Sequence, residues 1–330
     1  MEKTLAEVTL KSTEPMRIVR TTAPEPAWTD RIMPFLHHKG ETWLEPMRKA
    51  YNEGLDRLEM HNYMGLLDSG DIVGNINTFE HQGVGILAHV FTPDHQRRKG
   101  ICTHIIHALR DDFVSRGGRA MFLGTGHDTP PYHIYETVGF RGRGDSGKMT
   151  WLVDETFDES YFALDDVVTT SVRDTRWEDW PKLEALYAVA GQWQLKSCYL
   201  QLMGHTGFEG PYLTMRKEMQ AGTIGDVKVM QTDSGAIVGH AMLATQPLWK
   251  GRALVLELMV HANFYPIATD LISAMTIPVG VKVQAFCDER ASDKMAALEH
   301  AGFEKEGFFA AQAEDEDHRP MGVAVYGRVG

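Results

Sequence analysis

Cysteines and long apolar runs are scarce in this sequence. The chain has 330 residues and three cysteines, Cys102, Cys198 and Cys287, whose scattered positions form neither a CxxC pair nor a disulfide framework. This usage is typical of a reducing compartment. No apolar run reaches the roughly 18 residues that a membrane helix requires, and residues 1–15 lack the apolar core of a signal peptide. We therefore expect a cytoplasmic protein that does not interact with membranes.

Positive charge is also in short supply. Lys and Arg together number 33, against 45 Asp and Glu, which gives a net charge of −12. Such a field repels the phosphates of nucleic acid and favours cationic partners, so we expect no nucleic-acid partner. The apolar fraction of 43% excludes global disorder, and the length is sufficient for two domains that each bury a core.

The pattern of apolar residues predicts two domains. Four segments are expected: an N-terminal lead (1–15), a first domain (16–153), an acidic linker (154–165) and a second domain (166–330). In each domain we expect a strand, two helices, a meander of three strands, a helix, a strand, a helix and a final strand or hairpin. Within the lead, Leu5, Val8 and Leu10 could instead add an edge strand.

Two dipeptides recur between the domains. Val73-Gly74 returns as Val238-Gly239, 238 − 73 = 165 positions later, and Gly139-Phe140 returns as Gly302-Phe303, 302 − 139 = 163 positions later. The order of the surrounding elements agrees with these offsets. The sequence therefore predicts a tandem duplication.

The most informative segment is a basic turn between a strand and a helix. It reads TPDHQRRKGICTHII at 92–106, and an apolar-periodic helix begins directly after Gly100. Amides at a helix start have no partner within the helix and lie at the positive end of its dipole. Together with Arg97, Arg98 and Lys99 they form an anion site suited to a pyrophosphate. The alternative is a solvated turn with an ordinary loop glycine.

A second motif lies further along the chain. YETVGF at Tyr135–Phe140 closes a short predicted helix. The sequence resembles the GNAT superfamily of acyl-CoA N-acyltransferases at Arg97–Cys102 and Tyr135–Phe140. The pattern of that superfamily is a strand, then [QR]xxGx[GA] at the start of a long helix, then YExxGF. Cys102 is a departure, since Gly or Ala is usual there. The resemblance covers most of 16–153 and, more faintly, 166–330.

The resemblance implies an α+β fold of two tandem GNAT-like domains, each a mixed, mostly antiparallel twisted sheet flanked by helices. It implies acetyl-CoA as cosubstrate. Backbone groups of Val90, Phe91 and Thr92 would pair with the pantetheine arm, and Asp128 stands where the family often has an Asn that touches pantetheine. The pyrophosphate would be held by six consecutive residues, Arg97, Arg98, Lys99, Gly100, Ile101 and Cys102.

Candidate catalytic residues have competing interpretations. In the resemblance Tyr135 protonates the departing thiolate, since an unperturbed pKa of about 10 keeps it protonated; the alternative is a tyrosine that only packs its helix on the sheet. His89 could relay a proton at neutral pH or be a hydrogen-bonded core residue. Glu80 and His81 could act through a bridging water. Cys102 lies at a helix start, an environment that lowers the pKa of a thiol.

No metal is expected, because the 15 histidines complete no signature such as HExxH. The second domain lacks both motifs: the segment equivalent to the basic turn, 259–272, has neither glycine nor a basic cluster, and Leu298 stands in place of Tyr135. We therefore predict that the N-terminal domain transfers acetyl from acetyl-CoA to a primary amine of a small or peptidic acceptor, and that the second copy is silent. The alternatives are a non-catalytic acyl-CoA-binding sensor and a tandem acyltransferase similar to mycothiol synthase or the peptidoglycan-branching enzymes. A homodimer is compatible with each.

Overall fold

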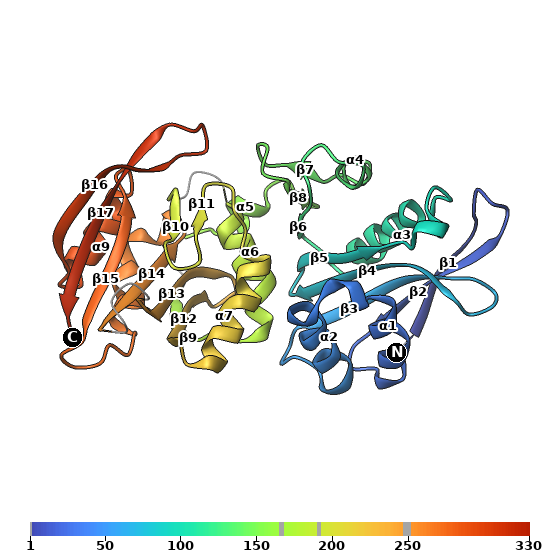
Figure 1. The fold of residues 1–330 in the computed structure, drawn as a ribbon, viewed down its shortest axis with the longest axis horizontal. Helices are drawn as coiled ribbons and strands as arrows, with labels where there is room; N and C mark the ends of the chain where they lie inside the picture. Colours follow the sequence, from blue (N-terminus) through green and yellow to red (C-terminus); the bar gives the residue numbers. More distant parts are fainter. Residues whose placement is uncertain (1, 165–167, 190–192, 247–251) are drawn as a thin grey trace. The chain divides into compact units, whose positions relative to one another are not determined.

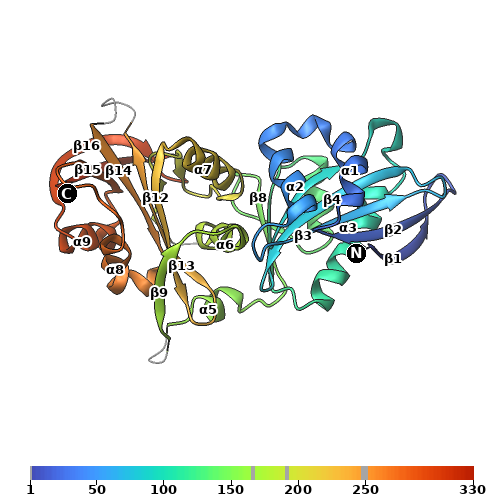
Figure 2. The ribbon, with the colours of Figure 1, turned by 90° about the horizontal axis from the view of Figure 1, so that it is seen from below.

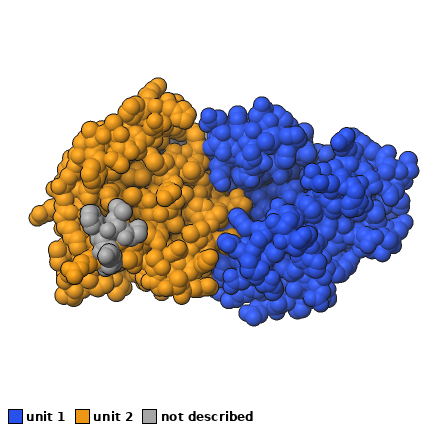
Figure 3. All heavy atoms as spheres, viewed as in Figure 1, with its two compact units in different colours: residues 1–157, 176–182 blue, residues 158–175, 183–330 orange. Residues whose placement is uncertain are grey.

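A computed structural model describes residues 2–164, 168–189, 193–246 and 252–330. The chain divides into two compact units, residues 1–157 with 176–182 and residues 158–175 with 183–330, which are coloured separately in Figure 3. The boundary falls inside one helix, Trp180–Ala188. The sequence also predicts a strand at 166–174 and a helix at 177–190. The first two positions of that strand, the last position of that helix and the last position of the linker lie outside the described residues.

The first unit follows the predicted order of elements (Figure 1). Its strands and helices are β1 (Glu2–Thr9), β2 (Pro15–Thr22), α1 (Thr29–Phe35), α2 (Glu41–Glu53), β3 (Glu59–Leu66), β4 (Ile72–His81), β5 (Val84–Phe91), α3 (Ile101–Ser115), β6 (Ala120–Gly124), α4 (Pro130–Glu136), β7 (Arg141–Gly142) and β8 (Lys148–Leu152).

The first sheet has the order β1-β2-β3-β4-β5-β6-β8-β7. The β5–β6 pair is parallel, as its long α3 crossover requires, and the other neighbours are antiparallel. Figure 1 shows α3 on one face of this sheet and α1 and α2 on the other. The N-terminal residues form the edge strand β1, which pairs with β2.

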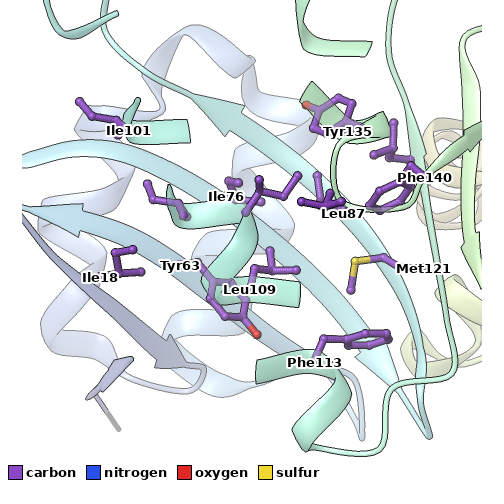
Figure 4. Close-up of a cluster of buried hydrophobic side chains, with 14 of the residues drawn as sticks. Ile18, Tyr63, Ile76, Leu87, Ile101, Leu109, Phe113, Met121, Tyr135 and Phe140 are labelled. Atoms are coloured by element: carbon purple, nitrogen blue, oxygen red, sulfur yellow. The ribbon is translucent and has the colours of Figure 1, made fainter. Parts of the chain in front are cut away.

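The core between α3 and the sheet fixes the start of that helix. Ile101, Ile105, Leu109 and Phe113 recur every fourth residue, so they form one apolar stripe that lies against the buried side chains of the strands (Figure 4). A Cβ atom on Gly74 of β4 would lie 2.5 Å from Cγ2 of Ile101. Glycine at this strand position therefore lets the first turn of α3 rest directly on the sheet.

The second unit repeats the architecture with one addition. Its elements are α5 (Phe157–Tyr161), β9 (Thr170–Asp174), α6 (Trp180–Ala188), β10 (Leu195–Ser197), β11 (Leu202–Met203), α7 (Glu209–Ala221), β12 (Ile224–Thr232), β13 (Ile237–Thr245), β14 (Ala253–Val260), α8 (Ala268–Ser273), β15 (Lys282–Asp288), α9 (Ser292–His300), β16 (Glu304–Glu314) and β17 (Pro320–Val329). The hairpin β10–β11 is the addition.

The second sheet has the order β16-β17-β15-β14-β13-β12-β9, with β14 and β15 parallel. Figure 2 shows α6 and α7 on one face of it and α8 and α9 on the other. Two mixed, mostly antiparallel sheets flanked by helices confirm the predicted α+β class. No helix in the described ranges is both long and apolar enough to cross a membrane.

Candidate functional site

Strands β5 and β6 separate partway along their length. They pair from Val84–Ala120 to Ile86–Phe122, after which β6 pairs only with β8. The register of β5 on β4 shifts at the same point, and His89 has a positive φ of 52° there. The bulge bends β5 beyond its last pair with β6, so the main chain of residues 88–91 is not paired with β6; we call this unpaired stretch the opening between the strands.

Backbone groups of the predicted pantetheine segment lie at this opening. The carbonyl of Val90 accepts a hydrogen bond from Lys39 Nζ at 3.4 Å, and that of Thr92 accepts one from Arg97 Nε at 3.2 Å. Phe91 packs edge-on against Phe35, with ring centroids 5.1 Å apart. A carbonyl oxygen has two lone pairs, so these contacts still permit a further backbone-like partner.

The basic turn leads directly into α3. Gly100 is the N-cap residue, with φ 87° and ψ 4°, and no side chain caps the helix. The amides of the first turn therefore have no partner within the helix and lie at the positive end of its dipole. A Cβ atom at Gly100 would have its nearest neighbour, the ring of His104, 3.6 Å away, so glycine is favoured here by its backbone conformation rather than by space.

The three basic residues of the turn have different environments. Arg97 forms an ion pair with Asp94 at 2.8 Å, and Lys99 forms one with Glu14 at 3.0 Å. Arg98 is exposed, and no partner for its guanidinium occurs among the described residues. Arg98 is thus the cation of this turn with no counter-ion inside the described part of the chain.

Tyr135 belongs to the same core as the start of α3. Its side chain is 5% exposed, and its ring lies edge-on to Phe140 with centroids 6.1 Å apart. Figure 4 shows the hydroxyl pointing away from Phe140. The ring therefore packs the helix on the sheet, as one of the two predictions for Tyr135 requires. The direction of the hydroxyl is compatible with the other prediction, in which Tyr135 donates a proton.

His89 is buried between aromatic rings. Its centroid lies 5.3 Å from that of Trp43 and 6.0 Å from that of Phe79. Burial, followed by the positive charges of Lys39 and His38, lowers the pKa of His89 to about 3. The ring is neutral at pH 7 and only weakly basic, which disfavours the predicted proton relay.

Glu80 and His81, the other candidate bases, and Asp128, the candidate pantetheine contact, have either another partner or a lowered pKa. Glu80 accepts two hydrogen bonds from Arg116, at 2.6 and 3.0 Å, on the α3 side of the sheet. Burial, followed by the charge of Lys182, lowers the pKa of His81 to about 4. Asp128 is exposed and forms an ion pair with His133 Nε2 at 3.1 Å.

The structure corrects the expectation for the Cys102 thiol. Burial raises its pKa to about 11, so the group is a thiol at neutral pH despite its position at a helix start. Burial removes water from around the thiol and disfavours the charged thiolate, which raises the pKa although Cys102 lies in the first turn of α3. Within the described residues, no group of three or more His, Cys, Asp and Glu side chains is arranged to hold a metal ion.

In the second unit the corresponding opening contains part of the chain itself. Strands β14 and β15 pair from Ala253–Lys282 to Val255–Gln284 and then separate. Beyond that point residues 195–199 bond to both strands. The amide of Leu195 donates to Asp288 Oδ2 at 3.1 Å, and those of Cys198 and Tyr199 donate to Glu257 at 3.1 and 2.6 Å.

Glu257 is 2% exposed, and burial raises the pKa of its carboxyl group. Leu298, the counterpart of Tyr135, is completely buried. The added hairpin was not expected from the sequence, because its strands are three and two residues long and carry no periodic signal.

Residues 63–151 match the family model described as FR47-like protein. The matched segment runs from β3 to β8 and contains both sequence motifs, although it is about a quarter of the chain. FR47-like proteins are related to the GNAT superfamily. The match therefore confirms the predicted resemblance for the region that carries the motifs. No curated protein matches the sequence.

Solved structures with similar folds are distant in sequence. A GNAT superfamily phosphinothricin acetyltransferase from Sinorhizobium meliloti in complex with AcCoA is 17% identical, with a TM-score of 0.40, over 49% of this chain and 88% of that one. A ribosomal-protein-alanine N-acetyltransferase from Brucella melitensis is 17% identical, with a TM-score of 0.38, over 48% and 99%. An N-acetyltransferase from Staphylococcus aureus Mu50 is 11% identical, with a TM-score of 0.37, over 49% and 98%.

Proposed function

We propose that the first unit is an N-acetyltransferase that moves an acetyl group from acetyl-CoA to a primary amine of a small or peptidic acceptor. The observation that carries this proposal is the uncapped start of α3, whose free amides follow directly on the strand that diverges from β6. A pyrophosphate needs amide donors at a positive helix end, and a pantetheine arm needs an unpaired strand edge. The family-model match over the same elements supports the assignment.

The chain's own groups have distinct roles in this proposal. Amides from Arg97 to Cys102 hold the diphosphate, and Arg98 adds a cation that has no counter-ion within the described residues. Backbone groups from Val90 to Thr92 orient the thioester. Tyr135 donates a proton to the departing thiolate, a contribution that is typically worth about 10²- to 10⁴-fold in rate.

The acceptor amine reacts in its neutral form, in which the nitrogen lone pair attacks the thioester carbonyl. The proton of the amine passes to water, because no side chain among the predicted bases has both a suitable pKa and a free position. This route predicts a rate that rises with pH until the amine is deprotonated.

The proposal assigns the activity to the first unit alone. In the second unit, residues 195–199 occupy the place between β14 and β15 that a pantetheine arm would take. A 3-10 helix, Ala262–Ile267, follows β14 and leads into α8, which has six residues where α3 has 15. These differences support one coenzyme per chain and a structural role for the second copy.

A sensor that binds acyl-CoA without turnover is the second candidate function. The depressed pKa of His89 and the engagement of Glu80 by Arg116 favour it, because they leave the first unit without a basic side chain among those predicted for catalysis. The two functions differ in whether the thioester is consumed.

A thiol-release assay separates these functions. Purified protein is mixed with acetyl-CoA and a panel of primary amines, and free coenzyme A is detected with a thiol reagent. Calorimetry on the same sample measures the coenzyme affinity and stoichiometry. We expect one site per chain and amine-dependent release. Binding without release for any amine would favour the sensor, and the absence of binding would exclude both functions.

A further inference from the structure

A group of asparagine side chains lies on the face of the first sheet that α1 and α2 cover. Asn62 on β3 is directly opposite Asn77 on β4, and Asn75 is two residues before Asn77 on the same strand. Side chains two residues apart on a strand share a face. The ring of His89 packs against Trp43 of α2, which places the group on that helix's side. The three asparagines are at most 1% exposed.

Hydrogen bonds join two of the three asparagines to each other and to the main chain of His89, and further polar atoms of the group have no hydrogen-bond partner. Asn75 Nδ2 donates to Asn77 Oδ1 at 2.8 Å and to the carbonyl of His89 at 3.0 Å. Asn75 Oδ1, Asn77 Nδ2 and His89 Nε2 are buried and have no partner among the described residues. Leaving such a group unsatisfied costs about 1–3 kcal/mol, and nearly all buried polar groups in native proteins have a partner. Two acceptor or donor atoms and a ring nitrogen in one place thus indicate a polar ligand.

The backbone at His89 is shaped for this arrangement. Its φ of 52° is rare for a residue with a side chain, and such conformations gather at functional sites. The bond from Asn75 to the His89 carbonyl ties the bulge to β4. Trp43, whose ring contacts that of His89 edge-on, is half-buried.

Lys39 is the cation that acts on His89. His38 acts on it as well, but burial, followed by the charge of Lys39, lowers the pKa of the His38 ring, which is therefore mostly neutral at pH 7. None of the groups that shift the pKa of His89 is a carboxylate. Glu80, which is also on β4, is buried on the opposite face of the sheet, where it forms an ion pair with Arg116. A polycation would therefore meet repulsion at this site, although the whole chain is acidic.

We propose that Asn75, Asn77 and His89 recognise a carboxamide beside the reacting amine, so that the acceptor is an α-amino amide such as the N-terminus of a peptide. This inference rests on the proposed acetyltransferase function. Asn77 Nδ2 donates to the carbonyl oxygen of the ligand amide, and Asn75 Oδ1 accepts from its N–H. His89 contributes a neutral ring nitrogen beside them.

The experiment compares two acceptors that differ in one group. L-alaninamide and 1,2-diaminopropane share a methyl group and the reacting amine, but the carboxamide of the first is an aminomethyl group in the second. We expect kcat/KM for the amide to exceed that for the diamine on the order of 10-fold or more, because two hydrogen bonds are lost with the diamine. Asn77→Asp keeps the side-chain size and the oxygen that accepts from Asn75 but replaces the free donor with a carboxylate. It should invert the preference.

A second measurement does not depend on turnover or on a variant. Protein with ¹⁵N-labelled asparagine is saturated with coenzyme A and titrated with each amine, and the side-chain amide signals of Asn75 and Asn77 are followed. L-alaninamide should shift both signals, and the diamine should not. The inference would be overturned if the diamine reacted as well as the amide, if Asn77→Asp left the preference for the amide unchanged, or if the asparagine signals did not shift. In each of these cases, acetyl-CoA binding by the wild type would leave the proposed function intact. Loss of that binding would instead overturn the proposed function.

Discussion

Replacing Gly100 separates the two properties that the coenzyme site needs, its backbone conformation and its charge. The residue is the N-cap of α3 with φ 87°, and a Cβ atom there would have no neighbour closer than 3.6 Å. Asparagine and aspartate tolerate this left-handed region better than other residues, at a cost of about 1 kcal/mol. Both Gly100→Asn and Gly100→Asp should therefore fold, with nearly equal unfolding temperatures.

The two variants should differ in acetyl-CoA affinity because only one adds charge. A carboxylate about 5 Å from one phosphate charge, at an effective dielectric constant of about 20, is repelled by roughly 3 kcal/mol. That corresponds to about 100-fold in Kd, and the second phosphate charge increases the effect. Both side chains have an oxygen that can accept from the α3 amides as an N-cap, so this competition is common to the two variants. Gly100→Asn keeps the shape without the charge and should bind within about tenfold of wild type.

Calorimetry with acetyl-CoA gives both affinities, and thermal melts followed by circular dichroism verify that each variant is folded. The decisive quantity is the ratio of the two Kd values rather than either value alone, since the backbone cost is common to both. Equal affinities of folded Gly100→Asn and Gly100→Asp would mean that no diphosphate lies beside this residue. The cofactor assignment and everything derived from it would then be wrong.

Four further outcomes are expected. Tyr135→Phe should lower kcat by about 10²-fold or more with little change in coenzyme affinity, and equal rates would reduce the tyrosine to packing. Arg116→Met leaves the buried Glu80 carboxylate without its partner and should lower the free energy of unfolding in urea by about 3–5 kcal/mol; a smaller loss would show that the pair is dispensable. His89 has a pKa of about 3 when folded and one near 6.5 when unfolded, so the unfolded chain binds more protons between these values. Stability should fall as pH drops below about 6.5, by about 1.4 kcal/mol per pH unit, and His89→Gln should remove that part of the slope in urea titrations. Alkylation of Cys102, followed by peptide mass spectrometry, should stay slow at pH 7.5 and accelerate toward pH 11, whereas rapid labelling at neutral pH would contradict the raised pKa.

Most of the fold could be predicted because its elements carry strong periodic signals. The meander of the first unit, the long helix α3 and the strand after it occur in the predicted order, and the same holds in the second unit. Short elements were missed for the opposite reason. The two-residue strand β7 and the hairpin β10–β11 are too brief to show a period, and their positions depend on contacts with residues far away in the chain.

The sequence predicts those parts of the site that depend on backbone conformation. It predicts less well the protonation of side chains, which depends on burial. The turn before Gly100 and the left-handed conformation follow from local sequence. The protonation of Cys102 and His89 does not, because desolvation by distant elements sets both pKa values. Asn75 and Asn77 are two residues apart in a strand, so their side chains share one face of the sheet. Two amides on a buried face need hydrogen-bond partners, and this spacing is the sequence feature that indicates the group.

The two sheets share some glycines and not others, and this difference separates packing from the proposed ligand binding. Gly74 and its counterpart Gly239 occur in both copies, and in each a Cβ atom would press on the following helix, 2.5 Å from Ile101 Cγ2 and 3.0 Å from Leu271 Cδ2. Both sheets therefore need glycine at this position to seat a helix closely, whether or not a ligand binds. Gly100 has no such counterpart in the second copy, where the residues around it have neither glycine nor a basic cluster. A glycine that only packed a loop would be expected in both copies. Gly100 occurs only in the first sheet's copy of this turn, where no side chain caps the helix and the end of β5 is not paired with β6. A ligand-binding role for Gly100 requires this distribution.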